Sequence, residues 1–218
     1  RQKYNNGASN KTNQRVSKGD PMKKYLVIGN PIEHSLSPKL HNFWIKNNNI
    51  DAVYEKKKTS DDELSNLILK VREKKIHGIN VTVPFKKNII PYLDYLSPES
   101  EKTQSVNTIY FENNKIIGHN TDIEGFEYSI KEKKLNITNK KVLILGAGGV
   151  VPSIIFPLKK MEASEIIISN RTKNKAENLK DLFKNLKIID WGEVPDFDII
   201  INATSIGLKK EDKIDLNF

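Results

Sequence analysis

The feature that most constrains the fold is a short apolar strand that runs directly into a glycine-rich turn. Residues 142–145 read Val-Leu-Ile-Leu, and the turn Gly-Ala-Gly-Gly follows at once. The first glycine of such a turn makes the tight bend, and the second lets backbone N–H groups approach a pyrophosphate. The helix expected next points its positive end at the same anion. The pattern predicts a dinucleotide-binding unit with Gly146, Ala147, Gly148 and Gly149 at the phosphates.

The fingerprint is incomplete, because its third position is Val151 and not Gly or Ala. An ordinary tight turn between strand and helix is therefore the alternative. A second strand, expected at 165–169, ends in Asn170, Arg171 and Thr172, where an NAD-binding fold usually has Asp or Glu for the ribose 2′-hydroxyl. Arg171 can bind a 2′-phosphate there, and Lys175 adds charge. These residues at the end of the second strand therefore predict that the cofactor is NADP and not NAD. The alternative is that Arg171 is a solvated side chain in an exposed loop.

Strand-like and helix-like segments alternate along the chain, which predicts an α/β fold with mainly parallel sheets flanked by helices. Ser37 is expected to cap the first helix, before Pro38, with Leu40, Phe43 and Trp44 at helical spacing. The expected strands are 25–28, 52–56, 78–83, 142–145, 165–169, 187–190 and 198–202, with a hairpin of 107–111 and 115–117. The other expected helices are one capped by Ser60, 89–93, 122–134, one after residue 149, and 173–184.

Composition excludes several classes of protein. The chain of 218 residues has no Cys, so disulfide frameworks, thiolate metal sites and cysteine nucleophiles are excluded. No apolar run approaches the roughly 20 residues of a membrane-spanning helix, and no signal peptide is present, which predicts a cytoplasmic protein. The net charge of +9 suggests nucleic acid, but the Lys, Asn and Ile codons of an A/T-rich genome explain much of it, and no basic face stands out. The four His show no metal-ligand spacing, so no metal is expected.

Small polar side chains gather in the first half of the chain, mostly where predicted strands end. Ligands of open α/β sheets bind beyond the carboxyl ends of the strands, so these groups suit a small polyhydroxy acid. Plainer roles exist for each: Ser37 and Asp122 as helix caps, Lys86 as a solvated cation, Asn80 and Thr82 as sheet lining. The candidate residues are Ser35, Ser37, Asn80, Thr82, Lys86, Asn107 and Asp122.

Seven motifs in order resemble the shikimate dehydrogenase family between about residues 24 and 207. Each motif alone is weak, and the ordered set is specific. The motifs are Gly29-Asn-Pro-Ile-Glu-His-Ser-Leu-Ser-Pro38, Asn80-Val-Thr-Val-Pro-Phe-Lys86, Ser105-Val-Asn-Thr108, Asn120-Thr-Asp122, Gly146-Ala-Gly-Gly149, Asn170-Arg-Thr172 and Asn202-Ala-Thr-Ser-Ile-Gly207.

The resemblance implies an NADPH-dependent, reversible reduction of 3-dehydroshikimate to shikimate, in aromatic amino acid biosynthesis. It implies that Lys86 and Asp122 are the catalytic pair, Lys86 supplying a proton or stabilising the developing alkoxide. The implied substrate-binding residues are Ser35 and Ser37 for the carboxylate, and Asn80, Thr82, Asn107 and Asp122 for the ring hydroxyls. The implied cofactor residues are Gly146 to Gly149, then Asn170, Arg171, Thr172 and Lys175 at the 2′-phosphate, and Thr204 near the nicotinamide.

The resemblance also implies two domains. Residues 22–122 form an α/β substrate-binding catalytic domain, and residues 123–218 form a Rossmann-like NADP-binding domain. We expect residues 1–21 to be a disordered tail before a natural start at Met22. Members of the family continue beyond the equivalent of Phe218, so the second domain is expected to be incomplete at its C-terminal end.

The glycine turn departs from the family pattern, since it continues Val150-Val-Pro-Ser153 and not with small residues and an Arg. Two alternative functions stay open: a quinate/shikimate dehydrogenase that uses NAD, and a truncated, non-catalytic remnant that binds NADP or another ligand. The expected partner is a small-molecule substrate, with no nucleic acid and no membrane, in a monomer or homodimer.

Overall fold

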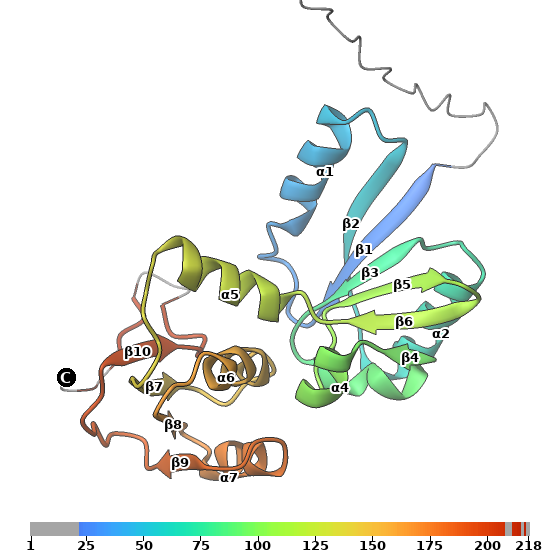
Figure 1. The fold of residues 1–218 in the computed structure, drawn as a ribbon. Coiled ribbons are helices and arrows are strands. Elements are labelled where there is room, and N and C mark those ends of the chain that lie inside the picture. The colour runs from blue at the N-terminus through green and yellow to red at the C-terminus, as the bar shows by residue number, and fades with distance from the viewer. Residues whose placement is uncertain (1–21, 208–210, 215, 217–218) are drawn as a thin grey trace, which may run out of the picture.

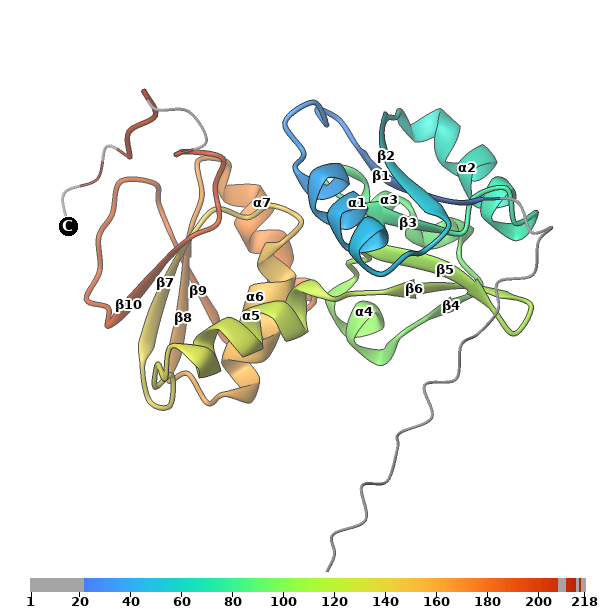
Figure 2. The same ribbon diagram turned by 90° about the horizontal axis from the view of Figure 1, so that it is seen from above.

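Two β-sheets joined by one helix make up the part of the chain that the structure describes. The computed structural model describes residues 22–207, 211–214 and 216. Helix α5 (Asp122–Glu132) leads from the first sheet to the second (Figure 1), and Figure 2 shows the sheets in two separate lobes. The predicted tail, residues 1–21, lies outside the described residues. No helix among the described residues is long and apolar enough to cross a membrane.

The first sheet has six strands in the order β2-β1-β3-β5-β6-β4. It is mixed, because β5 runs antiparallel to both of its neighbours. The β5–β6 hairpin was predicted, and it turns through Asn113 and Asn114, both at positive φ, as the favoured two-residue hairpin turn requires. The strands are β1 (Lys23–Gly29), β2 (Ala52–Lys58), β3 (Gly78–Val81), β4 (Tyr95–Leu96), β5 (Thr108–Glu112) and β6 (Lys115–His119).

Helices cover both faces of this sheet. On one face, α2 (Leu64–Arg72) buries the apolar stripe Leu64, Leu67, Ile68 and Val71, as predicted from its spacing. The helix follows a 3₁₀ turn, η1 (Asp61–Glu63), which Ser60 caps. On the other face lies α1 (Ser37–Asn47), none of whose residues is fully buried. The remaining elements are α3 (Phe85–Asn88), η2 (Ile90–Tyr92) and α4 (Pro98–Thr103).

The second sheet has four parallel strands in the order β10-β7-β8-β9. Its middle strands are almost entirely apolar, as expected for parallel strands buried on both faces. From β7 the chain moves through β8 to β9 on one side and then returns to form β10 on the other side of β7, which places a switch point at the carboxyl ends of β7 and β10. The strands are β7 (Lys141–Leu145), β8 (Glu165–Ser169), β9 (Leu186–Ile189) and β10 (Ile199–Asn202).

The described helices of the second lobe pack on one face of its sheet. They are α5, α6 (Val151–Lys160), α7 (Lys173–Glu177) and the 3₁₀ turn η3 (Asn178–Asp181). On the other face, Leu143, Leu145 and Ile167 pack against Trp191 and Phe197. The turn between β7 and α6 lies beside the end of β10 and contacts the first lobe, because a Cβ on Gly146 would lie 2.9 Å from the Ala203 carbonyl oxygen and Ser105 donates to the Gly149 carbonyl at 3.1 Å.

Some predictions of local structure were inaccurate or incomplete. The third strand ends at Val81, because the Phe85 N–H bonds the Thr82 carbonyl and begins a turn into α3. The helix expected at 89–93 is replaced by α3, from Phe85, and η2. The helix expected at 173–184 is divided into α7 and η3. Strand β4 and helix α4 were not predicted at all.

Candidate active site

The two charged residues of the predicted catalytic pair form a partly buried ion pair between the sheets. Lys86 lies in the first turn of α3, only 9% exposed, and its Nζ is 2.6 Å from Oδ2 of Asp122. Asp122 is the first residue of α5 and makes no capping hydrogen bond, so a capping role does not account for it. The Lys86 stem lies beside the glycine turn, 3.9 Å from where a Cβ on Gly149 would stand. The Lys86 side chain is thus held next to the predicted cofactor site.

Asn107 holds the second oxygen of the carboxylate. Its Nδ2 donates to Asp122 Oδ1 at 2.8 Å and to Thr121 Oγ1 at 2.9 Å. Its Oδ1 accepts hydrogen bonds from the Thr121 N–H at 3.0 Å and the Thr108 hydroxyl at 2.9 Å. Both oxygens of Asp122 therefore have protein partners, which fix the carboxylate in one orientation.

Asn80, on β3, extends this network away from the ion pair. Its Nδ2 donates to the Asn107 carbonyl and to Thr108 Oγ1, at 3.2 and 3.1 Å. Its Oδ1 accepts from the hydroxyl of Tyr54 at 2.7 Å. Sequence reasoning missed Tyr54, because one aromatic residue in a strand indicates packing and carries no signal of a polar role.

Ser35, Ser37 and Thr82 stand outside this network of side-chain hydrogen bonds. The prediction that Ser37 caps α1 is wrong: the cap position is Leu36, and Ser35 Oγ accepts the Ser37 N–H at 3.3 Å instead. Pro38 does lie in the first turn, as predicted. The Ser37 hydroxyl has no hydrogen bond within the described chain, which leaves it available to a ligand.

Thr82 follows β3 at the point where β1 ends. A Cβ on Gly29 would lie 2.6 Å from Thr82 Cγ2, so only glycine allows this close approach of the two strand ends. The Thr82 N–H continues the pairing of the strands by donating to the Ile28 carbonyl at 2.9 Å. The Thr82 side chain is half-buried at the carboxyl edge of the sheet, where parallel strands present ligand-binding groups.

The glycine turn has the backbone geometry that a pyrophosphate site needs. Gly146 has a φ of +109°, and a Cβ there would lie 2.9 Å from the carbonyl oxygen of Ala203, after β10. Nothing lies within 4 Å of the position a Cβ would take on Gly148, so the backbone is open on that side. A ligand can therefore approach the N–H groups at the start of α6.

One cavity of about 280 Å³ collects most of the predicted cofactor residues. Gly149 instead lines a neighbouring hollow with Lys86. The cavity is lined by Gly146, Ala147, Gly148, Asn170, Arg171, Thr172, Lys175 and Thr204, together with Val83, Trp191, Ala203 and Ser205.

The cations of α7 and of the loop before it differ in what they bind. Lys173 pairs with Asp190 at 2.7 Å, and this hydrogen bond raises the pKa of its ammonium group. Arg171 and Lys175 are exposed and have no ion pair in the described chain. Asn170 donates to the Thr172 carbonyl at 2.7 Å and so shapes the corner that presents them. Two uncompensated cations beside a glycine turn suit a ligand with an additional phosphate, so these residues fit NADP.

Buried hydrogen bonds connect this half of the site to the catalytic half. Ser105 donates to the Gly149 carbonyl at 3.1 Å. Asn120, fully buried, donates to Ser153 Oγ on α6 at 2.9 Å, and its Oδ1 accepts the Asp122 N–H at 3.1 Å. We did not predict these links, since they join segments that are distant in sequence.

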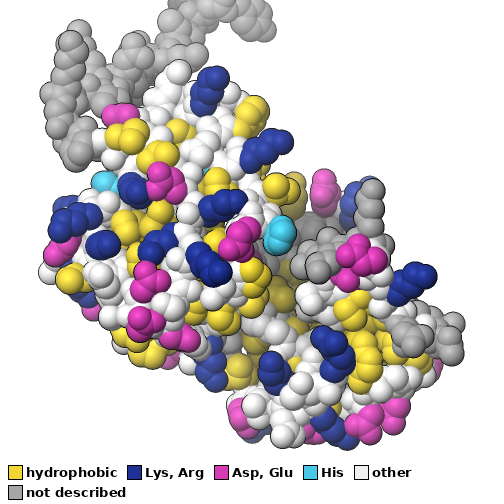
Figure 3. All heavy atoms as spheres, turned by 180° about the vertical axis from the view of Figure 1, so that it is seen from behind, with side chains coloured by type: hydrophobic (Ala, Val, Ile, Leu, Met, Phe, Trp, Pro, Cys, Tyr) yellow, Lys and Arg dark blue, Asp and Glu magenta, His cyan; other side chains and the backbone are white. Residues whose placement is uncertain are grey.

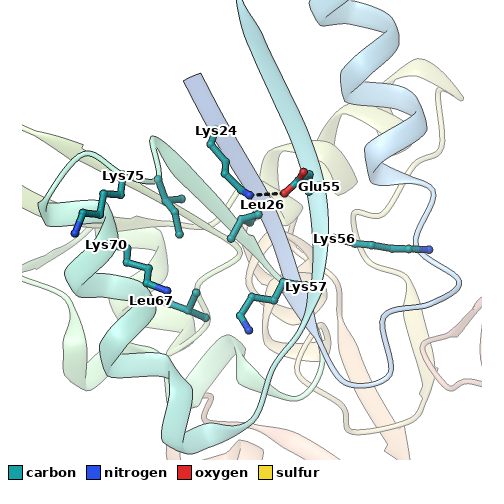
Figure 4. A pocket seen from close by; sticks show the side chains of 9 residues that line it. Lys24, Leu26, Glu55, Lys56, Lys57, Leu67, Lys70 and Lys75 are labelled. Carbon is teal, nitrogen blue, oxygen red and sulfur yellow. Dashed lines mark ion pairs between the residues drawn. The ribbon is translucent and has the colours of Figure 1, made fainter. Parts of the chain in front are cut away.

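A second hollow, of about 450 Å³, lies between β1, β2 and α2, away from the ion pair (Figure 4). Lysines surround it, but Glu55 pairs with Lys24, Glu63 with Lys57, and Glu73 with Lys75. Figure 3 likewise shows basic and acidic side chains interspersed over one face. No group of three His, Asp or Glu side chains within the described ranges could hold a metal ion.

Comparison with family models matches both halves of the chain. Residues 27–109 match the shikimate dehydrogenase substrate binding domain, and residues 129–209 match shikimate / quinate 5-dehydrogenase. The gap between the two matches contains the predicted domain boundary at residue 122. A curated shikimate dehydrogenase (NADP(+)) of Pelagibacter ubique is 61% identical over 196 residues, which are 90% of this chain and 74% of that protein.

Solved structures agree with the sequence comparison. The crystal structure of shikimate dehydrogenase from Aquifex aeolicus superposes with a TM-score of 0.80 at 40% identity, over 88% of this chain and 72% of that one. The structure of shikimate 5-dehydrogenase from Thermus thermophilus, in complex with NADP(H) and shikimate, superposes with a TM-score of 0.76 at 31% identity. The match covers 86% of this chain and 70% of that one. The two family matches include Lys86, the glycine turn at residues 146–149 and Arg171, while Asp122 lies in the segment between them.

Proposed function

We propose, because the chain belongs to the shikimate dehydrogenase family, that it catalyses the NADP-dependent interconversion of 3-dehydroshikimate and shikimate. The observation that carries this is the Lys86–Asp122 ion pair, held 2.6 Å apart beside the glycine turn. The pair supplies a proton donor and the turn supplies a place for the pyrophosphate. A ketone reductase needs both within one cleft.

Lys86 is proposed to act on the oxygen of the reacting carbonyl. NADPH, when bound, supplies the hydride to the carbonyl carbon. The Lys86 ammonium can donate a proton to the oxygen, or stabilise the negative charge that develops there. Asp122 orients the Lys86 side chain through its Oδ2. In the reverse direction, Lys86 takes the proton of the substrate hydroxyl.

The remaining predicted residues are proposed to bind and orient. Ser35 and Ser37 hold the substrate carboxylate, and the free hydroxyl of Ser37 supports this role. Asn80, Thr82, Asn107 and Asp122 hold the ring hydroxyls. The cofactor-binding residues are Gly146, Ala147, Gly148 and Gly149 at the pyrophosphate, Asn170, Arg171, Thr172 and Lys175 at the adenosine phosphate, and Thr204 on the nicotinamide side.

The two lobes are proposed to divide these tasks near residue 122, with substrate in the first and NADP in the second. The separate sheets and their separate cores support this division. Arg171 and Lys175, uncompensated at the cavity, favour NADP over NAD. A monomeric or homodimeric state and a cytoplasmic location remain predictions from the sequence.

The test mixes the protein with shikimate and NADP⁺ and follows the absorbance of the reduced nicotinamide. We expect turnover with NADP⁺ and shikimate, and much weaker turnover with NAD⁺ or with quinate. Absence of turnover at saturating concentrations of both ligands would contradict the proposal. Binding of NADP⁺ without turnover would favour the non-catalytic alternative.

A further inference from the structure

Tyr54 is a buried tyrosine on β2 that three different contacts hold in place. Its side chain is 4% exposed, and its ring stacks on His41 with centroids 4.1 Å apart and planes at 3°. Asn42, on α1, accepts the Tyr54 N–H at 3.0 Å and donates to its carbonyl at 2.8 Å. The hydroxyl then reaches Asn80 Oδ1 at 2.7 Å. These contacts on the backbone, the ring and the hydroxyl together hold Tyr54 in one conformation.

The hydrogen bonds of Asn80 leave its amide little freedom. A side-chain amide has two donor hydrogens and one oxygen with two lone pairs. Both hydrogens are used, on the Asn107 carbonyl and on Thr108 Oγ1. The Tyr54 hydroxyl takes one lone pair of the oxygen. What Asn80 can still offer a ligand is one acceptor site and no donor.

The opposite orientation of this amide is unfavourable. It would place Asn80 Oδ1 against the Asn107 carbonyl oxygen, an acceptor facing an acceptor. The Tyr54 hydroxyl reinforces the choice because it is a donor. Burial raises the pKa of Tyr54, so the phenol keeps its proton at physiological pH.

We propose that Tyr54 is a positioning residue for the substrate, an inference that rests on the proposed function. It fixes the Asn80 amide so that this point of the site accepts a hydrogen bond from a free hydroxyl of a polyhydroxy acid. A ligand that carries only an acceptor at that position meets the Asn80 oxygen and is disfavoured. Tyr54 thereby contributes to the choice of substrate without touching it.

The same hydrogen bonds continue to the catalytic pair. From Asn80 they pass through Thr108 to Asn107, and Asn107 donates to Asp122, the partner of Lys86. Tyr54 therefore lies at one end of a path that ends at the ion pair. Asp122 keeps its direct contact with Lys86 when the far end is removed, so we expect substrate binding to be affected more than turnover.

The experiment compares Tyr54→Phe with Tyr25→Phe. Tyr25 is the register partner of Tyr54 on β1, it packs near His77, and its hydroxyl has no hydrogen bond in the described chain. For Tyr54→Phe, we expect the KM for shikimate to rise about three- to tenfold, because the variant loses one neutral hydrogen bond. For the same variant we expect kcat within about twofold of the wild-type value and an unchanged KM for NADP⁺. Tyr25→Phe should have the kcat and both KM values of the wild type.

A thermal shift measurement separates positioning from folding. Shikimate should raise the Tm of Tyr54→Phe less than it raises the Tm of the wild type, whereas NADP⁺ should raise both equally. An unchanged KM for shikimate in Tyr54→Phe would overturn the inference, as would parallel changes in both KM values. A wild-type protein without turnover would instead refute the proposed function, and the inference with it.

Discussion

The Asn120 side chain donates a hydrogen bond to Ser153 Oγ at 2.9 Å, and neither residue is exposed to solvent. Asn120 follows β6 in the first lobe, and Ser153 lies in the first turn of α6 in the second. Because Asn120 Oδ1 also accepts the Asp122 N–H, one amide joins the catalytic carboxylate to the helix that follows the glycine turn. The relative placement of proton donor and cofactor turn thus depends on a buried polar contact.

Replacing Ser153 with Ala should weaken this joint without unfolding the protein. Asn120 keeps its bonds to the Ser105 carbonyl and Thr103 Oγ1, so we expect unfolding free energy to fall by about 1 kcal/mol. Urea denaturation measures the change. Ser129→Ala is the control, because the exposed Ser129 hydroxyl bonds only within α5. Equal unfolding free energies of the two variants would show that the Asn120–Ser153 hydrogen bond does not contribute to the stability of the fold.

Replacing Lys86 with Ala should remove the proton donor. We expect kcat to fall by about 10²–10⁴-fold, the usual contribution of general acid catalysis. NADP⁺ binding, measured by thermal shift, should persist, because the cavity for the cofactor does not require the Lys86 ammonium. Lys87→Ala, a change to the exposed neighbour, should leave kcat near the wild-type value. A Lys86→Ala protein with wild-type turnover would exclude the assigned role.

Replacing Arg171 with Ala tests the choice of cofactor. Its guanidinium is exposed and unpaired, and charge-assisted hydrogen bonds are worth about 1.5–3 kcal/mol. We therefore expect the KM for NADP⁺ to rise about ten- to hundredfold and the KM for NAD⁺ to change little. Lys184→Ala, an exposed cation of the same lobe, serves as control. Equal effects on both nucleotides would place Arg171 away from the adenosine phosphate.

Periodicity predicted the elements whose pattern is purely local. The stripe of α2 and the bounds of β8 follow from side chains alone, and the turn at Asn113 and Asn114 follows from its residue types. The glycine turn and the residues Asn170 to Thr172 could be expected to line one cavity, because they follow the carboxyl ends of the neighbouring strands β7 and β8. Local signals were sufficient wherever the contacts are close in sequence.

Predictions were less accurate where contacts between distant segments determine the burial or the role of a side chain. Leu40, Phe43 and Trp44 have helical spacing, yet each is about half exposed, so spacing alone did not indicate a buried face. Tyr54 gave no signal, and Asn120 appeared only as part of the motif Asn120-Thr-Asp122, since the polar role of either residue depends on a partner from another element. The fold class and the proximity of Lys86 to Asp122 could therefore be predicted from the sequence, and the residues that hold this pair in place could not.

A last prediction concerns pH, and it rests on Asp94. The carboxylate accepts the Ile116 N–H at 2.6 Å and pairs with Arg72 Nη2 at 2.9 and 2.8 Å, which joins α2 to β6. The Ile116 backbone N–H, with the Arg72 charge in addition, lowers the pKa of Asp94 below its ordinary value near 3.8. A lowered pKa in the folded state means that the folded protein favours the ionised form.

The contribution of Asp94 to stability is therefore complete above about pH 4 and is lost as the pH falls through its folded pKa. Asp94→Asn should lower the unfolding free energy at pH 7 by about 1 kcal/mol, a modest value because the group is partly solvated. The difference from wild type should shrink toward pH 3. Asp51→Asn, whose exposed side chain has no partner in the described chain, should show neither effect. A pH-independent difference would mean that the charge of Asp94 is not what stabilises this contact.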